Sequence, residues 1–211
     1  MRKVALYWFG LSLLISISAL ALSFHGLEIF EQSNLASPPP TLIKAQGTIE
    51  VAFSPQNGAT QMIIRAINEA KTTILVASYN FTAAELARAL VQAQKRGVKV
   101  MLLFDKSQAT QKYSSSTFFA NLGIPQRIDY KHAIFHDKFM VIDDKTVITG
   151  SFNFTKSAEL RNAENVLILR NNPQLAQLFS RDWWFNWQQA LPRSEFLMKY
   201  KMHDRANLSA D

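Results

Sequence analysis

Side chains that can act together on a phosphate group fall within eighteen residues of this sequence. His136 and Lys138 stand two residues apart, so both would project from the same face of a strand. Ser151 and Asn153 stand in a short turn that follows the β-rich run 146–149. An imidazole can attack phosphorus or carry a proton, while ammonium, hydroxyl and carboxamide groups can donate to non-bridging phosphate oxygens. The pattern therefore indicates phosphoryl-transfer chemistry.

An isolated histidine on a sheet would favour a structural interpretation. Here Lys138 would share the face of His136, and two cations side by side are unfavourable unless an anion completes the site. This favours a functional role for both. Asp143 begins a tight turn, where aspartate is common for backbone reasons alone. A scaffolding role and a direct chemical role for Asp143 both remain open at this point.

The elements that must position these residues follow from alternating apolar runs. The composition is 48% hydrophobic and 18% charged, which indicates a globular chain, and without cysteine it has no disulfide. The strands are predicted at 48–53, 73–79, 98–104, 128–130, 138–142, 146–149 and 164–169, with helices at 57–70, 82–96 and from 172. Such alternation predicts an α/β fold, with a mostly parallel or mixed central sheet flanked by helices on both faces.

The pattern H-x-K-x4-D-x6-G-S-x-N, from His136 to Asn153, resembles the signature of the phospholipase D superfamily without a mismatch. The resemblance extends over about residues 48–190. Within the superfamily, the chain is similar in particular to the small exported Nuc-type bacterial endonucleases. Segments outside the motif that carry it are Val51–Pro55, Lys95–Val98, Gly123–Pro125 and Phe154–Lys156. Those enzymes act on DNA without sequence preference, as dimers and without divalent metal. Residues 106–116 have no close match in that group.

The resemblance implies a role for each residue of the site. His136 would attack phosphorus and carry a covalent phosphohistidine, with its ring held in one tautomer by an acceptor. Glu164 stands where the family has that carboxylate; a capping or surface acid is the alternative. The predicted catalytic residues are His136, Lys138, Asp143, Ser151, Asn153 and Glu164, and the predicted substrate contacts are Lys138, Ser151, Asn153 and Lys156.

The signature occurs once, and the chain has no internal repeat. In-line displacement needs one group to attack phosphorus and a second to protonate the leaving oxygen from the opposite side. Larger family members supply two motifs from one chain, so a two-fold homodimer is predicted to bring two copies of His136 to one site. His132 lies outside the motif and is predicted to be a loop residue or a substrate contact. Nothing has metal-ligand spacing, so neither a metal nor another cofactor is expected.

Two substrates fit this chemistry, and nucleic acid, DNA or RNA, is favoured. The formal charge is +7, which suits a polyanion. Basic residues that could line a groove for a phosphate backbone are Lys106, Lys112, Arg127, Lys131, Lys156 and Arg161. The rival is hydrolysis of a phospholipid such as phosphatidylcholine or cardiolipin, for which the sequence offers no exposed apolar lip or amphipathic surface helix. A membrane-tethered DNA-binding accessory without activity is a third, less favoured reading.

The N-terminus indicates export. Arg2 and Lys3 precede an uncharged run, 4–23, which fits a cleaved signal peptide or a retained membrane anchor. In both cases the positive end stays cytoplasmic and the body crosses, so a periplasmic, secreted or inner-membrane-anchored catalytic domain is expected. The predicted parts are the signal or anchor at 1–23, a proline-containing linker at 24–47, the catalytic domain at 48–190 and a polar C-terminal tail at 191–211.

Overall fold

One sheet runs through the part of the chain that the computed structural model describes, residues 36–111 and 114–208. The predicted signal or anchor at 1–23 and the first part of the predicted linker, 24–35, lie outside the described residues. The strands are β1 Thr48–Ser54, β2 Thr73–Ser78, β3 Lys99–Asp105, β4 Gln126–Asp129, β5 Lys138–Ile142, β6 Thr146–Gly150, β7 Glu164–Arg170 and β8 Leu191–Pro192. The helices are α2 Ala59–Glu69, α3 Ala84–Lys95, α4 Ser107–Thr110, α5 Ser116–Asn121, α6 Lys156–Leu160, α7 Pro173–Gln189 and α8 Arg193–Leu208.

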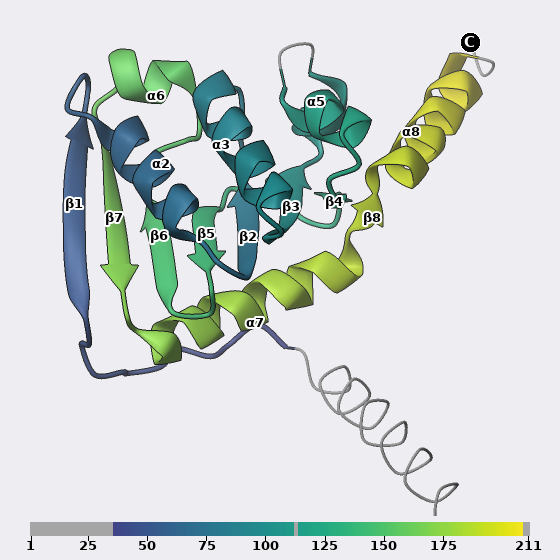
Figure 1. Ribbon diagram of the computed structural model, residues 1–211. Helices are drawn as coiled ribbons and strands as arrows, with labels where there is room; N and C mark the ends of the chain where they lie inside the picture. The colour runs from purple at the N-terminus through teal and green to yellow at the C-terminus, as the bar shows by residue number, and fades with distance from the viewer. Residues whose placement is uncertain (1–35, 112–113, 209–211) are drawn as a thin grey trace, which may run out of the picture. The chain divides into compact units, whose positions relative to one another are not determined.

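The sheet is mixed, with the strand order β1-β7-β6-β5-β2-β3-β4-β8 (Figure 1). Strands β2, β3 and β4 run parallel, since helical segments return the chain to the start of the next strand. The other neighbouring pairs are antiparallel. The predicted hairpin is β5–β6, with Phe139 opposite Thr149. The predicted α/β fold with a mixed sheet and helices on both faces is confirmed.

Side chains of the sheet alternate between two cores, one on each face. Helices α2 and α3 cover the face to which β2 contributes Val76. Helix α7 covers the opposite face, to which β2 contributes Ala77. This period of two also places the site, because Lys138 shares the α2–α3 face with Met140, two residues further along β5.

Helix α7 is fixed at its start and along its buried side. Asn172 Oδ1 accepts from the Leu175 N–H at 3.0 Å, and proline occupies the first turn, where its missing N–H costs nothing. Trp183 is fully buried, and its Nε1 donates to the Val76 carbonyl at 2.9 Å. The tryptophans of this helix therefore pack against the sheet.

The predicted polar tail from residue 191 packs more closely than its composition indicated. It begins with β8, which pairs with β4, and continues as α8. Phe196 is only 8% exposed and belongs to the core of the α2–α3 face. Arg193 donates to Ser116 Oγ at 3.0 Å and to Thr117 Oγ1 at 2.8 Å. Apolar side chains, Leu191, Phe196 and Leu197, and the guanidinium of Arg193 therefore dock this segment.

The start of α3 also differs from its prediction. The sequence Thr82–Glu85 predicts a capping box, but the helix begins after Ala83 without a side-chain cap. The N–H groups of Thr82 and Ala83 instead each donate to the Phe154 carbonyl at 3.0 Å. This contact ties the end of β2 to the turn that follows β6. Within 36–111 and 114–208, no helix is both long and apolar enough to cross a bilayer.

Candidate active site

The motif residues His136 and Lys138 lie at the end of the sheet where the parallel strands β2 and β3 finish. Lys138 is the first residue of β5 and pairs with Ser78, the last residue of β2. The Tyr79 N–H donates to the Asp137 carbonyl at 2.9 Å and extends this pairing one step further. Ligands of open α/β sheets bind beyond the carboxyl ends of parallel strands. The motif therefore stands where this fold places binding sites.

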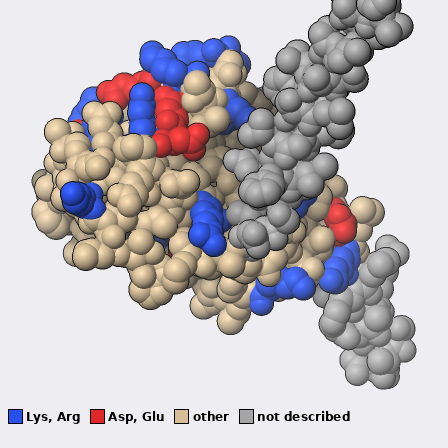
Figure 2. Space-filling model, turned by 90° about the horizontal axis from the view of Figure 1, so that it is seen from below, with Lys and Arg blue, Asp and Glu red and all other residues tan. Residues whose placement is uncertain are grey.

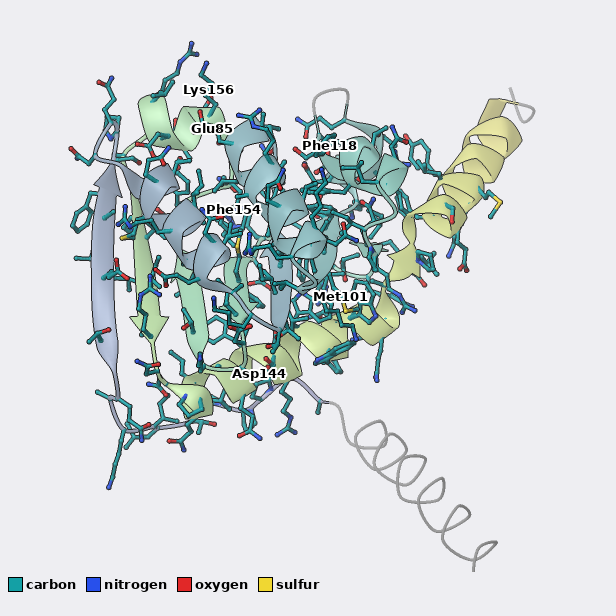
Figure 3. All side chains as sticks on the ribbon, viewed as in Figure 1. Glu85, Met101, Phe118, Asp144, Phe154 and Lys156 are labelled. Carbon is teal, nitrogen blue, oxygen red and sulfur yellow. The ribbon has the colours of Figure 1, made fainter. Side chains whose placement is uncertain are left out.

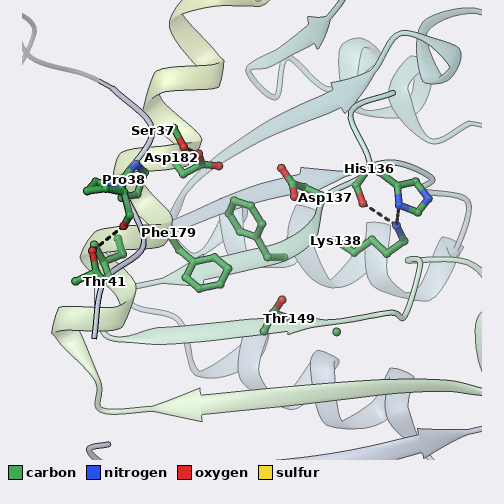
Figure 4. A pocket seen from close by; sticks show the side chains of 13 residues that line it. Ser37, Pro38, Thr41, His136, Asp137, Lys138, Thr149, Phe179 and Asp182 are labelled. Carbon is green, nitrogen blue, oxygen red and sulfur yellow. Dashed lines mark hydrogen bonds between the residues drawn. The ribbon is translucent and has the colours of Figure 1, made fainter. Parts of the chain in front are cut away.

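The Lys138 ammonium is held against His136 (Figure 4). Its Nζ lies 3.2 Å from Nδ1 and 2.7 Å from the carbonyl oxygen of His136. Lys138 is 9% exposed, and burial lowers the pKa of its ammonium against the opposing effect of nearby carboxylates. Because an ammonium only donates, Nδ1 accepts, and the neutral ring carries its proton on Nε2. Attack by Nε2 requires that proton to move, so His136 must then exchange Lys138 for an acceptor.

The carboxylate predicted to be that acceptor is bonded elsewhere. Glu164 Oε2 accepts from Ser151 Oγ at 2.6 Å, and Oε1 accepts from Asn162 Nδ2 at 3.0 Å. None of the hydrogen bonds among the described residues joins Glu164 to the ring of His136. Its charge nevertheless acts on the site, because it opposes the fall in the pKa of Lys138. The expected Glu164–His136 contact is therefore not formed within one chain.

Ser151 links the turn after β6 to strand β7. Its hydroxyl donates to Glu164 and accepts from the Asn165 N–H at 3.0 Å, while its own N–H donates to the Asn165 carbonyl at 3.1 Å. Gly150 permits this approach, since a Cβ there would lie 2.3 Å from the Asn165 carbonyl oxygen and its φ is +150°. Both Ser151 donors are thus engaged, so the predicted phosphate contact would require Ser151 to leave these partners.

Asn153 reaches the same end of the sheet through the turn. Phe154 forms an isolated parallel bridge with Phe81, three residues beyond β2. This pairing holds Asn153, half-buried, beside the end of β2. Its Oδ1 is buried without a hydrogen-bond partner among the described residues. The fold thus brings His136, Lys138, Ser151 and Asn153 to one end of the sheet.

Asp143 lies at the other end of β5. Five residues separate it from Lys138, which is roughly 17 Å along a strand that rises about 3.3 Å per residue. Figure 3 shows this separation, with the neighbouring Asp144 at the lower end of the sheet and Lys156 at the upper end. The predicted catalytic role of Asp143 is therefore not supported by its position.

The carboxylate of Asp143 instead fastens the loop that leads into β2. It accepts from the N–H groups of Lys71 at 2.9 Å, Thr72 at 2.8 Å and Thr73 at 3.1 Å, and from the Thr72 hydroxyl at 2.8 Å. Burial alone would raise its pKa, but these donors outweigh burial and hold the pKa of Asp143 below its usual 3.8. Of the two roles that the sequence left open, scaffolding fits this geometry.

Replacing Asp143→Asn is expected to lower the free energy of unfolding by about 1–2 kcal/mol, the usual worth of a hydrogen-bonded charge in a partly exposed site. A carboxylate with a lowered pKa stabilises the fold above its unfolded value of 3.8 and loses that effect as the pH falls through its folded pKa. The difference from wild type, measured by urea unfolding, should therefore be full at pH 7 and shrink below pH 3.8. Asp144→Asn, in the same turn and also at positive φ, is the control and should cost under about 0.5 kcal/mol. Equal losses for both variants would contradict this role.

The predicted basic groove divides in the structure. Lys106, Lys131, Lys156 and Arg161 are exposed and follow β3, β4 or β6 at the end that carries the motif. None of them takes part in the ion pairs found among the described residues. At the opposite end, seen from below in Figure 2, Lys and Arg stand in separate groups, with Asp and Glu among the upper groups and uncharged surface between the others.

Two of the predicted groove residues do not join this set. The guanidinium of Arg127 donates to the Trp187 carbonyl at 2.8 Å and lies 5.0 Å from the centre of the Trp187 ring, which is a packing role. Lys112 lies outside the described residues. His132 is a loop residue, as predicted, with Nδ1 3.1 Å from the Asp129 carboxylate.

Tyr79 and Asp137 border the site without having been predicted. The ring centre of Tyr79 lies 4.6 Å from that of His136 and 5.3 Å from Lys138 Nζ, so it covers both groups. Burial, and then Asp182, raises the pKa of Asp137. A place at the carboxyl end of a predicted parallel strand was the signal that could have identified Tyr79. A cavity of about 410 Å³ extends from the site to the α7 face (Figure 4); its lining includes His136, Asp137, Lys138, Phe179, Asp182 and the segment 37–41.

Within 36–111 and 114–208, no group of three or more histidine, aspartate or glutamate residues is placed to hold a metal ion. The donors assembled at the site are those of Lys138, the carboxamide of Asn153 and the imidazole of His136. Their chemistry is that of an anion site with one nucleophile.

Known proteins share this fold and sequence. The family described as cardiolipin synthase, PLD-like domain, matches residues 63–184. A phospholipase D of Rickettsia bellii is 35% identical over 176 residues, which cover 80% of this chain and 87% of the relative. The mitochondrial cardiolipin hydrolase of Mus musculus is 30% identical over 143 residues, covering 67% and 64%. The structure of Nuc, a phospholipase D family member from Salmonella typhimurium, aligns with a TM-score of 0.66 and 41% identity over 69% of this chain and 97% of that one.

The mixed sheet with a histidine–lysine pair at its carboxyl end defines a class of phosphodiesterases. The chain belongs to the phospholipase D superfamily, and the predicted resemblance to that superfamily is confirmed.

Proposed function

We propose that this protein is an exported, non-specific endonuclease that cleaves DNA, or RNA, without a metal ion. The observation that carries this proposal is a set of four exposed cations around the motif that take part in none of the ion pairs among the described residues: Lys106, Lys131, Lys156 and Arg161. Cations that no carboxylate neutralises attract the phosphates of a nucleic-acid backbone, and they do so without reading bases.

The reaction needs two displacements. An imidazole nitrogen of His136 attacks phosphorus, a P–N bond forms, and the P–O bond to the leaving nucleoside breaks as that oxygen takes a proton from a second histidine. Water then attacks phosphorus, gives its proton to the second histidine, and the P–N bond breaks. Lys138, 9% exposed, stabilises the charge that develops on the non-bridging oxygens.

The second histidine would come from a second copy of this chain, because the motif occurs once. A second copy could also supply the acceptor that holds the His136 ring in one tautomer, since Glu164 does not reach the ring of its own His136. Strand β1 offers a surface for it: Ile49, Val51 and Phe53 are 61%, 54% and 59% exposed on the edge strand of the sheet. Pairing with Leu169, Leu167 and Asn165 turns them to the α7 face, and Phe53 lies at the site end. We propose that a two-fold partner covers this strip and brings the two copies of His136 together.

Phospholipid hydrolysis is the second candidate, and one observation favours it. The sequence predicted no exposed apolar lip, yet Ile134 is 57% and Leu160 is 41% exposed beside the motif. Apolar side chains at the mouth of a site can contact acyl chains at a membrane surface. Two isolated side chains are common on any soluble surface, so the four exposed cations favour nucleic acid.

The substrate is tested by incubating the purified full-length protein with plasmid DNA in EDTA, and separately with vesicles of phosphatidylcholine and cardiolipin. Plasmid nicking that survives the chelator and is absent in His136→Ala is expected. Release of choline or phosphatidate with intact plasmid would favour the lipid reading instead. A second pair of variants, Lys156→Glu and Lys95→Glu, separates the effect of a cation near the motif from the effect of the protein's overall charge. Lys156→Glu should slow nicking by about tenfold at low salt, whereas Lys95→Glu, on α3 away from the motif, should not.

A further inference from the structure

Polar atoms that are buried without a partner gather at one place in this fold. Among the described residues they are Ser78 Oγ, Asn80 Oδ1 and Asn153 Oδ1. Buried polar atoms are nearly always hydrogen-bonded, and an unpaired one costs free energy. Asn153 belongs to the motif, whereas Ser78 and Asn80 stand outside it. A cluster of such atoms at the active site indicates that the fold keeps these groups for a ligand.

The strand pairing places Asn80 beside the motif residues. Ser78 is fully buried and lies opposite Lys138 in the β2–β5 register. Asn80 follows two residues later. The parallel bridge between Phe81 and Phe154 then sets Asn80 and Asn153 side by side, each one residue before its bridged phenylalanine. Asn80 therefore completes a row that runs from Lys138 to Asn153 along the carboxyl end of β2.

The two carboxamides share one orientation. In each, the buried orphan is the oxygen, and the nitrogen is not among the buried unpaired atoms of the described chain. Because the two ends of a carboxamide point apart, Nδ2 of each residue points away from its buried Oδ1. Asn80 is only half-buried, which is consistent with one end reaching the site.

Resting on the proposed function, we propose that Asn80 is a further phosphate-binding residue, whose Nδ2 donates to a non-bridging oxygen beside Asn153 and Lys138. Phosphate oxygens accept hydrogen bonds, and a carboxamide offers donors without adding charge. A second cation next to Lys138 would repel its ammonium and deplete the charged form of Lys138. A neutral donor avoids that effect, which is the physical reason for asparagine here.

The proposal is tested by titrating inorganic phosphate into the full-length protein in a calorimeter, together with kinetics on bis(4-nitrophenyl) phosphate. Asn80→Ala should weaken phosphate binding about tenfold, the usual effect of one lost hydrogen bond to a charged group. Asn80→Asp should weaken it about a hundredfold or more, since a carboxylate also repels phosphate. Gln92→Glu makes the same isosteric change on the exposed side of α3 and should leave binding unchanged.

Thermal unfolding separates this role from a structural one. Asn80→Ala removes an unpaired buried acceptor, so its unfolding temperature should equal or exceed that of wild type while phosphate binding falls. Loss of stability with unchanged phosphate binding would overturn the proposal, as would wild-type protein that binds no phosphate. Protein that binds phosphate through Asn80 but hydrolyses no phosphodiester would uphold this inference and refute the proposed function. Asn80→Ser, which keeps a donor, should bind phosphate more tightly than Asn80→Ala.

Discussion

Replacing His136→Ala is expected to lower the rate of phosphodiester cleavage by about 10⁴-fold or more, the scale on which loss of an enzymatic nucleophile acts. In the proposed reaction the P–N bond forms at the His136 ring, and no other described side chain that borders this ring offers a comparable nucleophile. Tyr79 covers the ring at 4.6 Å, but a phenol hydroxyl is a weaker nucleophile than an imidazole. The measurement is the release of 4-nitrophenolate from bis(4-nitrophenyl) phosphate.

His132→Ala is the matched control for His136→Ala. It removes an exposed imidazole four residues away, whose Nδ1 lies 3.1 Å from the Asp129 carboxylate, and should change the rate only a few-fold. A reaction quenched in alkali should yield wild-type protein with a 4-nitrophenyl phosphoryl group on His136, because a P–N bond survives alkali and breaks in acid. Equal losses for the two variants, or that group on another residue, would contradict the assigned nucleophile.

Local periodicity explains why the core of the site could be predicted. The period of two in a strand puts His136 and Lys138 on one side, and in the structure Lys138 Nζ lies 3.2 Å from His136 Nδ1. The β5–β6 hairpin follows from Asp143–Lys145 between two apolar runs, and it returns the chain so that Asn153 reaches the motif. Each of these steps depends on residues close together in the sequence. The fold class was predictable for the same reason.

Longer-range pairing decided what could not be predicted. Aspartate in a turn suits both a catalytic and a scaffolding role, and only the loop 71–73, distant in sequence, shows that Asp143 binds backbone N–H groups. Glu164 has the right spacing for the family carboxylate, but the β6–β7 register places it against Ser151 instead of its own His136. Asn80 lies outside the motif, and the β2–β5 register together with the Phe81–Phe154 bridge brings it to the site.

Mixing wild-type protein with His136→Ala should reduce activity as the square of the wild-type fraction. If one site needs His136 from both copies, a mixed dimer is inactive, and equal amounts leave about one quarter of the activity. A site completed within one chain would leave about one half instead. The two proteins are unfolded together, refolded at several ratios and assayed with bis(4-nitrophenyl) phosphate. A linear dependence would refute the shared site, even for a protein that is dimeric.

The β1 strip gives the same claim a second, independent test. Val51→Asp puts a charge in the middle of the apolar strip, where Val51 is 54% exposed, and should give a monomer by light scattering with activity lost by more than about a hundredfold, since charge at an apolar interface opposes its burial. Leu42→Asp makes the same kind of change at a side chain that is 99% exposed outside β1, and should leave both mass and activity unchanged. Because Val51 contributes no group to the chemistry, its effect on rate can arise only through assembly or folding. An unchanged unfolding temperature at high dilution would exclude a folding defect as the cause of lost activity. A monomeric, folded and fully active Val51→Asp protein would refute the shared site, because the proton donor for the reaction at His136 would then have to come from the same chain.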